Sequence, residues 1–461
     1  MNGKINWSLY GAAISVNIVS LISGCGYGWT SPVLPKLKNE NDLSDNPFGK
    51  PITSFEESWI TSIISIGAAV GPFFGAIIVD RIGRKKTLLL LVLPIILANL
   101  VLAFATDIIL YYVSRFLLGL TFGCVYSIVP IYVGEIAEDS NRGNVGCFLS
   151  MMCTIGTLLC FIIGPYVSIK IFCLILIIPV VVFLISFGLF SPESPYYLLM
   201  MNRDDEARAA LKKLRRNYVE KELEEMKKNV EISSSTSTNL KDSLKSPAII
   251  RGLYIGCGLM FFQQFSGITV IISYMQPIFD ASGSTIPPEI STIIVGSIQL
   301  MANLTTSQLV DRLGRKILLL GSLVGGCVAH TILGVYFYLQ THNYDDVVSY
   351  LFWLPVCCLI LYIVLFMFGL GPVTWAMIGE LFPTHFRSFA STLTCFVCLF
   401  LAFILTFFFP NFSEMLGMAA SFWLFGTSCA FGVIFVWRVV PETKGKSLHD
   451  IQMILENRGK C

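Results

Sequence analysis

Long apolar stretches recur along the chain, and they constrain its fold more than any other feature. The first six lie at 8–29, 57–79, 87–105, 109–132, 145–167 and 171–190, and the second six lie at 251–279, 290–310, 317–339, 350–378, 388–409 and 415–438. A helix of about 20 residues crosses the hydrocarbon core of a bilayer, which is about 30 Å thick. Only 13% of the residues are charged, about half the share that is usual in a soluble domain. We therefore predict an all-α membrane protein with twelve transmembrane helices.

The charges that remain are divided unevenly between the two faces. With twelve spans both termini lie on one side, and the loops of the opposite side are acidic. Those loops hold Lys36, Lys38, Lys50 and Lys170 against Glu40, Asp42, Asp45, Glu56, Glu57, Asp107, Asp280, Glu289, Asp345, Asp346 and Glu414. Because basic residues concentrate in cytoplasmic loops, we expect both termini in the cytoplasm.

A charged segment at 191–250 separates the two sets of spans. Leucines recur among its charges with helical spacing, which predicts a cytoplasmic linker with short amphipathic helices. The expected organisation is a six-helix bundle at 1–190, this linker, a second six-helix bundle at 251–440 and a cytoplasmic tail at 441–461.

Three short motifs occur twice in the same order, which indicates an internal repeat. The pairs are Asp80–Lys85 with Asp311–Lys316, Glu135 and Arg142 with Glu380 and Arg387, and Pro192–Ser194 with Pro441–Thr443. Repeats in the same orientation require an even number of spans in each half, so the two bundles are related by an axis along the membrane normal. A binding site is then expected between the halves, near the midplane.

The charges of these motifs fall at the cytoplasmic ends of spans, and two interpretations are open. Anchoring of positive charge and helix capping would account for the arginines. Carboxylates at a fixed spacing favour pairing between helices, where each partly exposed pair contributes about 0–1 kcal/mol and several together bias a two-state equilibrium. The residues concerned are Arg81, Arg84, Glu135, Arg142, Glu193, Arg312, Arg315, Glu380, Arg387 and Glu442.

Polar side chains gather in the apolar span at 251–279. Gln263 and Gln264 are adjacent amides, and Thr269 and Tyr274 continue the polar line. In a membrane such groups either bind a polar ligand or hydrogen-bond neighbouring helices, and both readings stay open. Paired mid-membrane carboxylates, metal-ligand clusters and a phosphate-binding loop are all missing from the sequence. We therefore expect no enzyme, metal, cofactor or nucleic-acid partner.

The ordered set of motifs resembles the sugar porter family of the major facilitator superfamily over essentially the whole chain. The matching segments are Asp80–Lys85, Pro130–Gly143, Ser191–Pro195, Gln263–Gly267, Gly371–Pro383 and Pro441–Gly445. Gly28–Pro32 is most similar to insect facilitated trehalose and hexose transporters. The resemblance implies the major facilitator fold and alternating-access transport of a small sugar, a hexose or a trehalose-like disaccharide, across the plasma membrane. It implies that the protein lies in a lipid bilayer and has no obligate protein partner.

The resemblance also implies roles for individual residues. The implied sugar-binding residues are Gln263, Gln264, Thr269, Tyr274, Gln299, Trp375 and Ser150, and the charges at the cytoplasmic helix ends correspond to a gate that holds the inner side shut. The chain departs from glucose carriers in several places. Cys398-Leu399 and Met367 stand where those carriers have an Asn-Trp pair and a Glu. A site that lacks hydroxyl partners loses discrimination, so glucose is not assumed.

The resemblance implies that proton-coupled members of this family use a carboxylate in the first span together with an arginine in the fourth. Arg115 is present, but Gly26–Trp29 contains no acid, and His330 is interpreted as structural. We therefore expect passive, facilitative transport. A proton-coupled symporter and a non-transporting sugar sensor are the alternatives.

Overall fold

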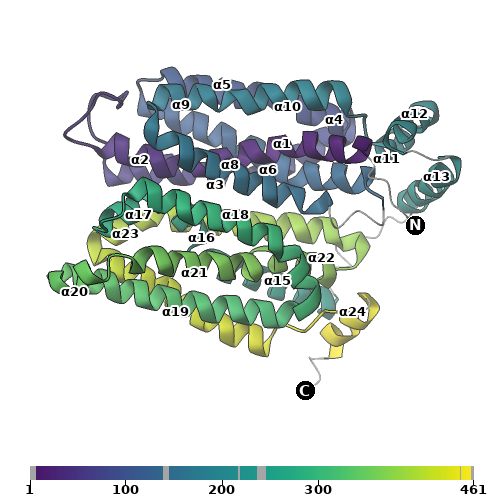
Figure 1. Cartoon of the computed structure of the whole chain (residues 1–461). Helices are drawn as coiled ribbons and strands as arrows, with labels where there is room; N and C mark the ends of the chain where they lie inside the picture. Colours follow the sequence, from purple (N-terminus) through teal and green to yellow (C-terminus); the bar gives the residue numbers. More distant parts are fainter. Residues whose placement is uncertain (1–6, 139–144, 216–218, 236–245, 447, 458–461) are drawn as a thin grey trace.

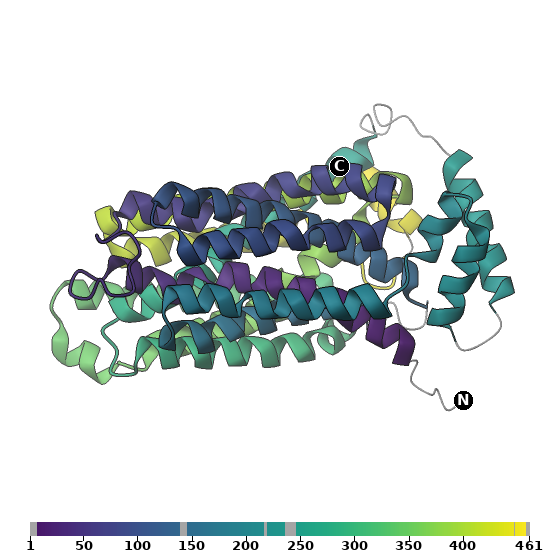
Figure 2. The same cartoon turned by 90° about the horizontal axis from the view of Figure 1, so that it is seen from above.

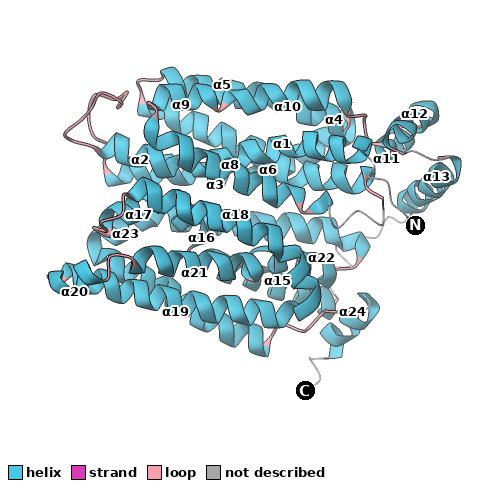
Figure 3. Cartoon of the chain, viewed as in Figure 1, coloured by secondary structure: helices cyan, strands magenta, loops and turns pink. Residues whose placement is uncertain are grey.

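A computed structural model describes residues 7–138, 145–215, 219–235, 246–446 and 448–457. Within these residues the regular structure is entirely helical, and the helices are joined by loops, of which the one between α2 and α3 is long (Figure 3). Figure 1 shows two bundles of roughly parallel helices, with the first half of the chain in one bundle and the second half in the other. The all-α prediction is confirmed.

The first bundle contains α1 to α10. Its helices are α1 (Trp7–Gly28), α2 (Thr30–Lys38), α3 (Ser54–Ile82), α4 (Arg84–Leu90), α5 (Val92–Phe104), α6 (Ile108–Ile136), α8 (Phe148–Ile163), η1 (Gly164–Tyr166), α9 (Ile169–Ile175) and α10 (Ile177–Phe190). The chain begins α3 with a capping box, in which Thr53 accepts the N–H of Glu56 and the Glu56 carboxylate accepts the N–H of Thr53.

Three short helices follow the first bundle and lie beyond the end of it (Figure 2). They are α11 (Pro195–Met200), α12 (Asp204–Leu214) and α13 (Glu220–Ser235). Their apolar faces form a small core of their own, which includes Leu198, Leu211 and Leu223. The amphipathic pattern of the sequence is explained by this packing.

The second bundle contains α15 to α23, and a short helix follows it. Its helices are α15 (Pro247–Phe265), α16 (Ile268–Ser273), α17 (Met275–Ala281), α18 (Pro288–Leu313), α19 (Arg315–Thr341), α20 (Asp345–Tyr350), α21 (Leu354–Phe368), α22 (Leu370–Leu381) and α23 (Thr384–Arg438), with α24 (Leu448–Asn457) after them. The helices break at Gly267, which has a φ of 90°, and at Gly369.

Ten helical segments of the described residues are long and apolar enough to cross a membrane. Two further observations bring this number to the predicted twelve. Helix α18 occupies the predicted eighth span, and α23 contains two spans that meet at Gly417, where the backbone leaves the helical region with a φ of 84°. The label α23 therefore covers two helices that meet at Gly417, which correspond to the spans predicted at 388–409 and 415–438.

Glycines allow the helices of the first bundle to approach closely. A Cβ atom at Gly24 would lie 1.9 Å from the carbonyl oxygen of Cys153, and one at Gly156 would lie 2.0 Å from that of Leu21. Helices α1 and α8 are thus packed backbone to backbone, as small residues permit in membranes. Between the halves, α3 packs against α23 and α8 packs against α18.

Candidate functional site

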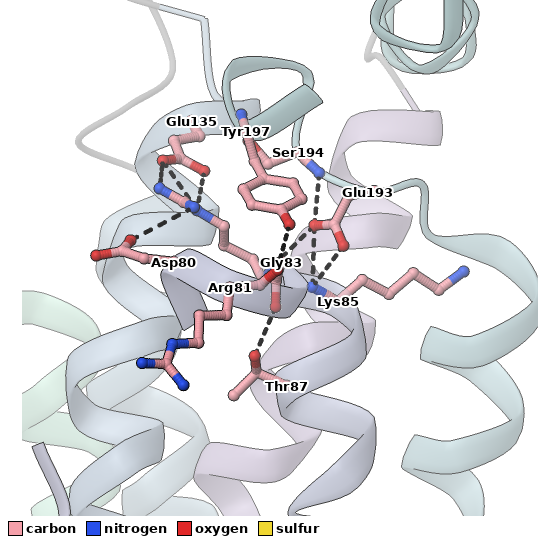
Figure 4. Close-up of polar contacts among 10 residues, drawn as sticks. Asp80, Arg81, Gly83, Lys85, Thr87, Glu135, Glu193, Ser194 and Tyr197 are labelled. Atoms are coloured by element: carbon pink, nitrogen blue, oxygen red, sulfur yellow. Dashed lines mark hydrogen bonds and ion pairs between the residues drawn. The ribbon is translucent and has the colours of Figure 1, made fainter. Parts of the chain in front are cut away.

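The first copy of the repeated charge motif is built around a carboxylate that binds backbone N–H groups (Figure 4). Glu193 accepts hydrogen bonds from the N–H groups of Arg84 at 3.1 Å and of Lys85 at 3.0 Å. These groups are unpaired at the start of α4, where a negative charge is also favoured by the helix dipole. Gly83 makes this possible, because its φ is 94° and a Cβ atom would lie 2.5 Å from the carboxylate. Glu193 therefore acts as a helix cap.

The side chain of Arg84 binds a different carboxylate. Its Nη2 lies 2.9 Å from Glu135 Oε1, and the guanidinium lies over the ring of Tyr197. Both charged side chains are mostly buried, with exposed fractions of 7% and 13%. Arg81 is exposed, and its side chain points away from Glu135 and Glu193 in Figure 4.

The second copy repeats this geometry at the start of α19. Glu442 accepts the N–H groups of Arg315 at 3.1 Å and of Lys316 at 2.9 Å, and it also accepts those of Thr443 and Lys444. Burial raises the pKa of Glu442, but these four donors outweigh that effect and hold the pKa below its ordinary value. Gly314 has a φ of 91°, as its counterpart in the first half does. The repeated motif is thus a repeated helix cap.

The second half also contains the corresponding ion pair. Arg315 Nη2 lies 3.0 Å from Glu380 Oε1, and Thr443 donates to the other oxygen of that carboxylate. Arg387 donates to the carbonyl of Phe382, while its Nε is buried and has no hydrogen-bond partner among the described residues. Arg142 and the side chain of Arg312 lie outside the described residues.

Each of the two interpretations of the charge motifs therefore holds for two of the four carboxylates. Glu193 and Glu442 cap helices, whereas Glu135 and Glu380 pair with arginines of other helices. In the described part of the chain, the ion pairs of this group join helices of the same half. In each half, the helix ends that carry the repeated motif are thus joined by ion pairs.

The two adjacent glutamines of α15 are buried and fully engaged with protein atoms. Gln263 Nε2 donates to the carbonyls of Leu370 at 2.8 Å and Gly371 at 3.2 Å, next to the break between α21 and α22. Gln264 Oε1 accepts the hydroxyl of Thr269 at 2.6 Å. The remaining amide atoms of both glutamines meet the sulfur of Cys398.

The other expected site residues are spread through both halves. Tyr274 is buried and donates its hydroxyl to the carbonyl of Thr406 at 2.9 Å. Ser150 donates to Asn303 Oδ1 across the halves at 3.0 Å. Gln299 is 3% exposed, and its Oε1 has no hydrogen-bond partner in the described part of the molecule. Trp375 is 45% exposed.

Three contacts join the two halves at the end of the molecule opposite the charge network, which is the set of caps and ion pairs formed by Glu135, Glu193, Glu380 and Glu442. The N–H of Gln276 donates to Ser31 at 3.0 Å, and Asn411 donates to Ser58 at 3.3 Å. The ring of Trp59 packs edge-on against Phe407 with centroids 5.1 Å apart. The chain is therefore closed on the face that the charge pattern assigns to the outside.

Arg115 is buried in the first bundle without a carboxylate among its contacts in the described structure. Its Nη1 donates to the carbonyl of Gly26 at 2.6 Å and its Nε to that of Ile60 at 3.1 Å, and the guanidinium lies over the ring of Trp29. His330 is also fully buried, with Nε2 2.9 Å from the carbonyl of Ser266. Both side chains are held by backbone carbonyls.

Sequence reasoning missed two contact residues. Cys398 was expected only as a position where a polar group is missing, and Asn303 was not singled out. Both lie within apolar spans, and a cysteine there gives no signal that distinguishes a contact with glutamine from ordinary packing. An asparagine in a span is a recognisable signal, because its amide needs a partner.

Comparisons with known proteins agree with one another. A family model described as "Sugar (and other) transporter" matches residues 16–455. A facilitated trehalose transporter Tret1-2 homolog of Drosophila sechellia is 36% identical over 455 residues, which cover 97% of this chain and 91% of that protein. The facilitated trehalose transporter Tret1 of Anopheles gambiae is 36% identical over 98% of this chain, which spans only 56% of that longer relative.

Solved structures with a similar fold include the xylose transporter XylE from E. coli. Its partially occluded inward-open conformation has a TM-score of 0.77 and 22% identity, over 95% of this chain and 99% of that chain. XylE bound to 6-bromo-6-deoxy-D-glucose has a TM-score of 0.75 and 22% identity, over 97% of this chain and all of that one. The likeness confirms the predicted fold of twelve helices in two bundles.

Proposed function

Because the chain belongs to the sugar (and other) transporter family, we propose that it carries a hexose or a trehalose-like disaccharide across the plasma membrane by facilitated diffusion. The relatives named as facilitated trehalose transporters support this substrate class. In this proposal the two bundles at 1–190 and 251–440 are the moving bodies, both termini are cytoplasmic, and the sugar binds between the halves.

The observation that carries the facilitative mechanism is the environment of Arg115. Proton coupling needs a group that gains and loses a proton during the cycle, and a membrane carboxylate beside an arginine is the usual choice. Arg115 binds the carbonyls of Gly26 and Ile60 instead. A backbone carbonyl does not gain or lose a proton, so the contacts of Arg115 do not couple transport to the proton gradient. The sugar gradient alone then sets the direction of transport.

The proposed sugar site consists of Gln263, Gln264, Thr269, Tyr274, Gln299, Trp375 and Ser150. Two features support a sugar as the ligand. The free Oε1 of Gln299 is a buried acceptor for a hydroxyl, and the exposed ring of Trp375 can cover an apolar sugar face. Tyr274 and Ser150 already bind protein atoms, so they define the walls of the site through the contacts they hold.

The charge network is the proposed cytoplasmic gate. In the present structure the outer seam is closed, and the pairs of Glu135 and Glu380 stay within their halves. The buried Nε of Arg387 lacks a partner among the described residues, so it is available to an acceptor of the other half when the inner side closes. The caps at Glu193 and Glu442 keep each half rigid during this movement.

Counterflow in proteoliposomes tests the proposed function. Vesicles loaded with unlabelled trehalose or D-glucose should transiently accumulate the labelled sugar from outside, with and without a protonophore. Vesicles without protein are the control for leakage. If neither sugar accumulates above this control, the transport function is refuted and a sensor becomes the better reading. If accumulation requires a proton gradient, the facilitative mechanism is refuted.

A further inference from the structure

The sulfur of Cys398 is the one atom that both site glutamines share. Gln264 Nε2 donates to Cys398 Sγ at 3.1 Å, and the thiol in turn donates to Gln263 Oε1 at 3.6 Å. Cys398 is 3% exposed and comes from α23, whereas both glutamines come from α15. The thiol therefore bridges two side chains that point in different directions from one helix.

The bridge is the weakest link of each glutamine. The other amide atoms bind strong partners, namely the carbonyls of Leu370 and Gly371 for Gln263 and the hydroxyl of Thr269 for Gln264. A thiol is a weak donor and a weak acceptor, whereas a sugar hydroxyl is strong in both senses. An incoming hydroxyl can therefore replace the sulfur at both amides without breaking any of the stronger bonds.

Two tyrosine hydroxyls of the first half show which polar groups remain open to a sugar. The hydroxyl of Tyr27 is buried and has no hydrogen-bond partner within the described residues. Tyr126 bonds the sulfur of Cys153 at 3.2 Å. Among the tyrosines of the described first half, Tyr126 thus has a thiol partner, and the hydroxyl of Tyr27 is left for a ligand.

We infer that Cys398 is a specificity-determining positioning residue, whose thiol occupies the place of a sugar hydroxyl between Gln263 and Gln264 until the sugar displaces it. This inference rests on the proposed function and deepens it. Buried amides without partners are costly, so an empty site needs a placeholder. A strong placeholder would oppose the sugar, and a thiol satisfies the amides while remaining replaceable.

The test compares Cys398→Ser with Cys398→Ala in counterflow of labelled D-glucose and trehalose. The two side chains have nearly the same volume and differ in one hydroxyl. Serine should hold the glutamines more firmly and raise the KM on the order of fivefold, as expected for one net hydrogen bond. Alanine leaves the amides without their placeholder and should lower the KM severalfold. The maximal rate should stay within about twofold in both variants.

Cys429 provides the matched control. It is a buried cysteine of α23 beyond the break at Gly417, 1% exposed, and its sulfur would lie 3.3 Å from a Cβ atom at Gly326. Cys429→Ser and Cys429→Ala should give equal KM values. Each variant is first checked for a monodisperse elution profile.

The outcomes separate the inference from the function it rests on. Equal KM values for the two Cys398 variants, or a reversed order, overturn the inference while the transport function stands. If the wild-type protein shows no counterflow of either sugar, the proposed function falls, and the inference falls with it.

Discussion

Alanine substitution of the two motif glycines should destabilise the first half more than the second. Gly83 and Gly314 both have positive φ angles, of 94° and 91°. Their ψ angles are 167° and 156°, which puts both in a backbone region that is essentially restricted to glycine. A side chain there costs about 1–3 kcal/mol. At Gly314 the new Cβ atom would lie 3.1 Å from the carboxylate of Glu442, which can move by a few tenths of an ångström. We expect Gly314→Ala to cost little more than the backbone term.

At Gly83 the added methyl group meets two obstacles. It would lie 2.5 Å from Glu193 Oε2 and 2.7 Å from a ring carbon of Tyr197. The carboxylate must leave the start of α4, and the loss of a helix cap costs about 0.5–2 kcal/mol. Together with the backbone term, Gly83→Ala should cost about 1.5–5 kcal/mol.

Thermal stability of detergent-solubilised protein, measured by fluorescence-detected size exclusion after heating, checks this order. Gly321→Ala is the control, because Gly321 lies within α19 and a Cβ atom there meets nothing within 4 Å. The expected order of stability is Gly321→Ala, then Gly314→Ala, then Gly83→Ala. Equal losses at the two motif glycines would refute the steric reasoning. A Gly83→Ala protein as stable as the control would refute the cap itself.

Two further predictions concern the carboxylates of the same network. Glu135→Gln should destabilise the protein more than Glu380→Gln in the same heating assay. It leaves Arg84, 7% exposed, with only the exposed Asp80 at 3.9 Å as a charged partner, whereas Arg315 is 17% exposed; equal losses would contradict this. The pKa of Glu442 is lowered in the folded protein, so the stability it contributes is complete above the ordinary pKa of a glutamate and is lost as the pH falls through the lowered value. The stability difference between wild type and Glu442→Gln should thus stay constant from pH 8 to about pH 5 and shrink only in stronger acid, and a difference that shrinks already between pH 7 and 5 would contradict it.

The spans could be predicted because an apolar run of membrane length has few other solutions in a chain of this kind. Their ends could not. The first span is predicted to end at residue 29, but the chain continues as α2 to Lys38, whose ammonium binds Glu57 at 2.7 Å. This ion pair satisfies a carboxylate that is 3% exposed, and a hydropathy pattern contains no information about such a partner.

The roles of the charged residues were predictable in part. The repeat predicted Glu135 and Glu193 at one set of helix ends, and Glu135 lies in the last turn of α6 while Glu193 binds the start of α4. Whether a carboxylate binds a guanidinium or a row of N–H groups depends on the backbone beside it. Gly83 lets Glu193 reach the start of α4 because its φ angle is positive. The sequence motif shows that a glycine is present, but it does not show this angle.

The centre of the molecule shows why the expected polar groups come mainly from the second half. The first helix of the first half, α1, is committed to close packing, since a Cβ atom at Gly24 or Gly26 would lie within about 2 Å of α8 or α6. The first helix of the second half, α15, corresponds to α1 in the repeat and carries Gln263 and Gln264. A repeat that is symmetric at its helix ends is therefore asymmetric at its centre. One half supplies a closely packed wall with an arginine held by backbone carbonyls, and the other supplies the amides. Substitutions in α15 should therefore alter sugar selectivity, whereas those at the glycines of α1 should alter assembly.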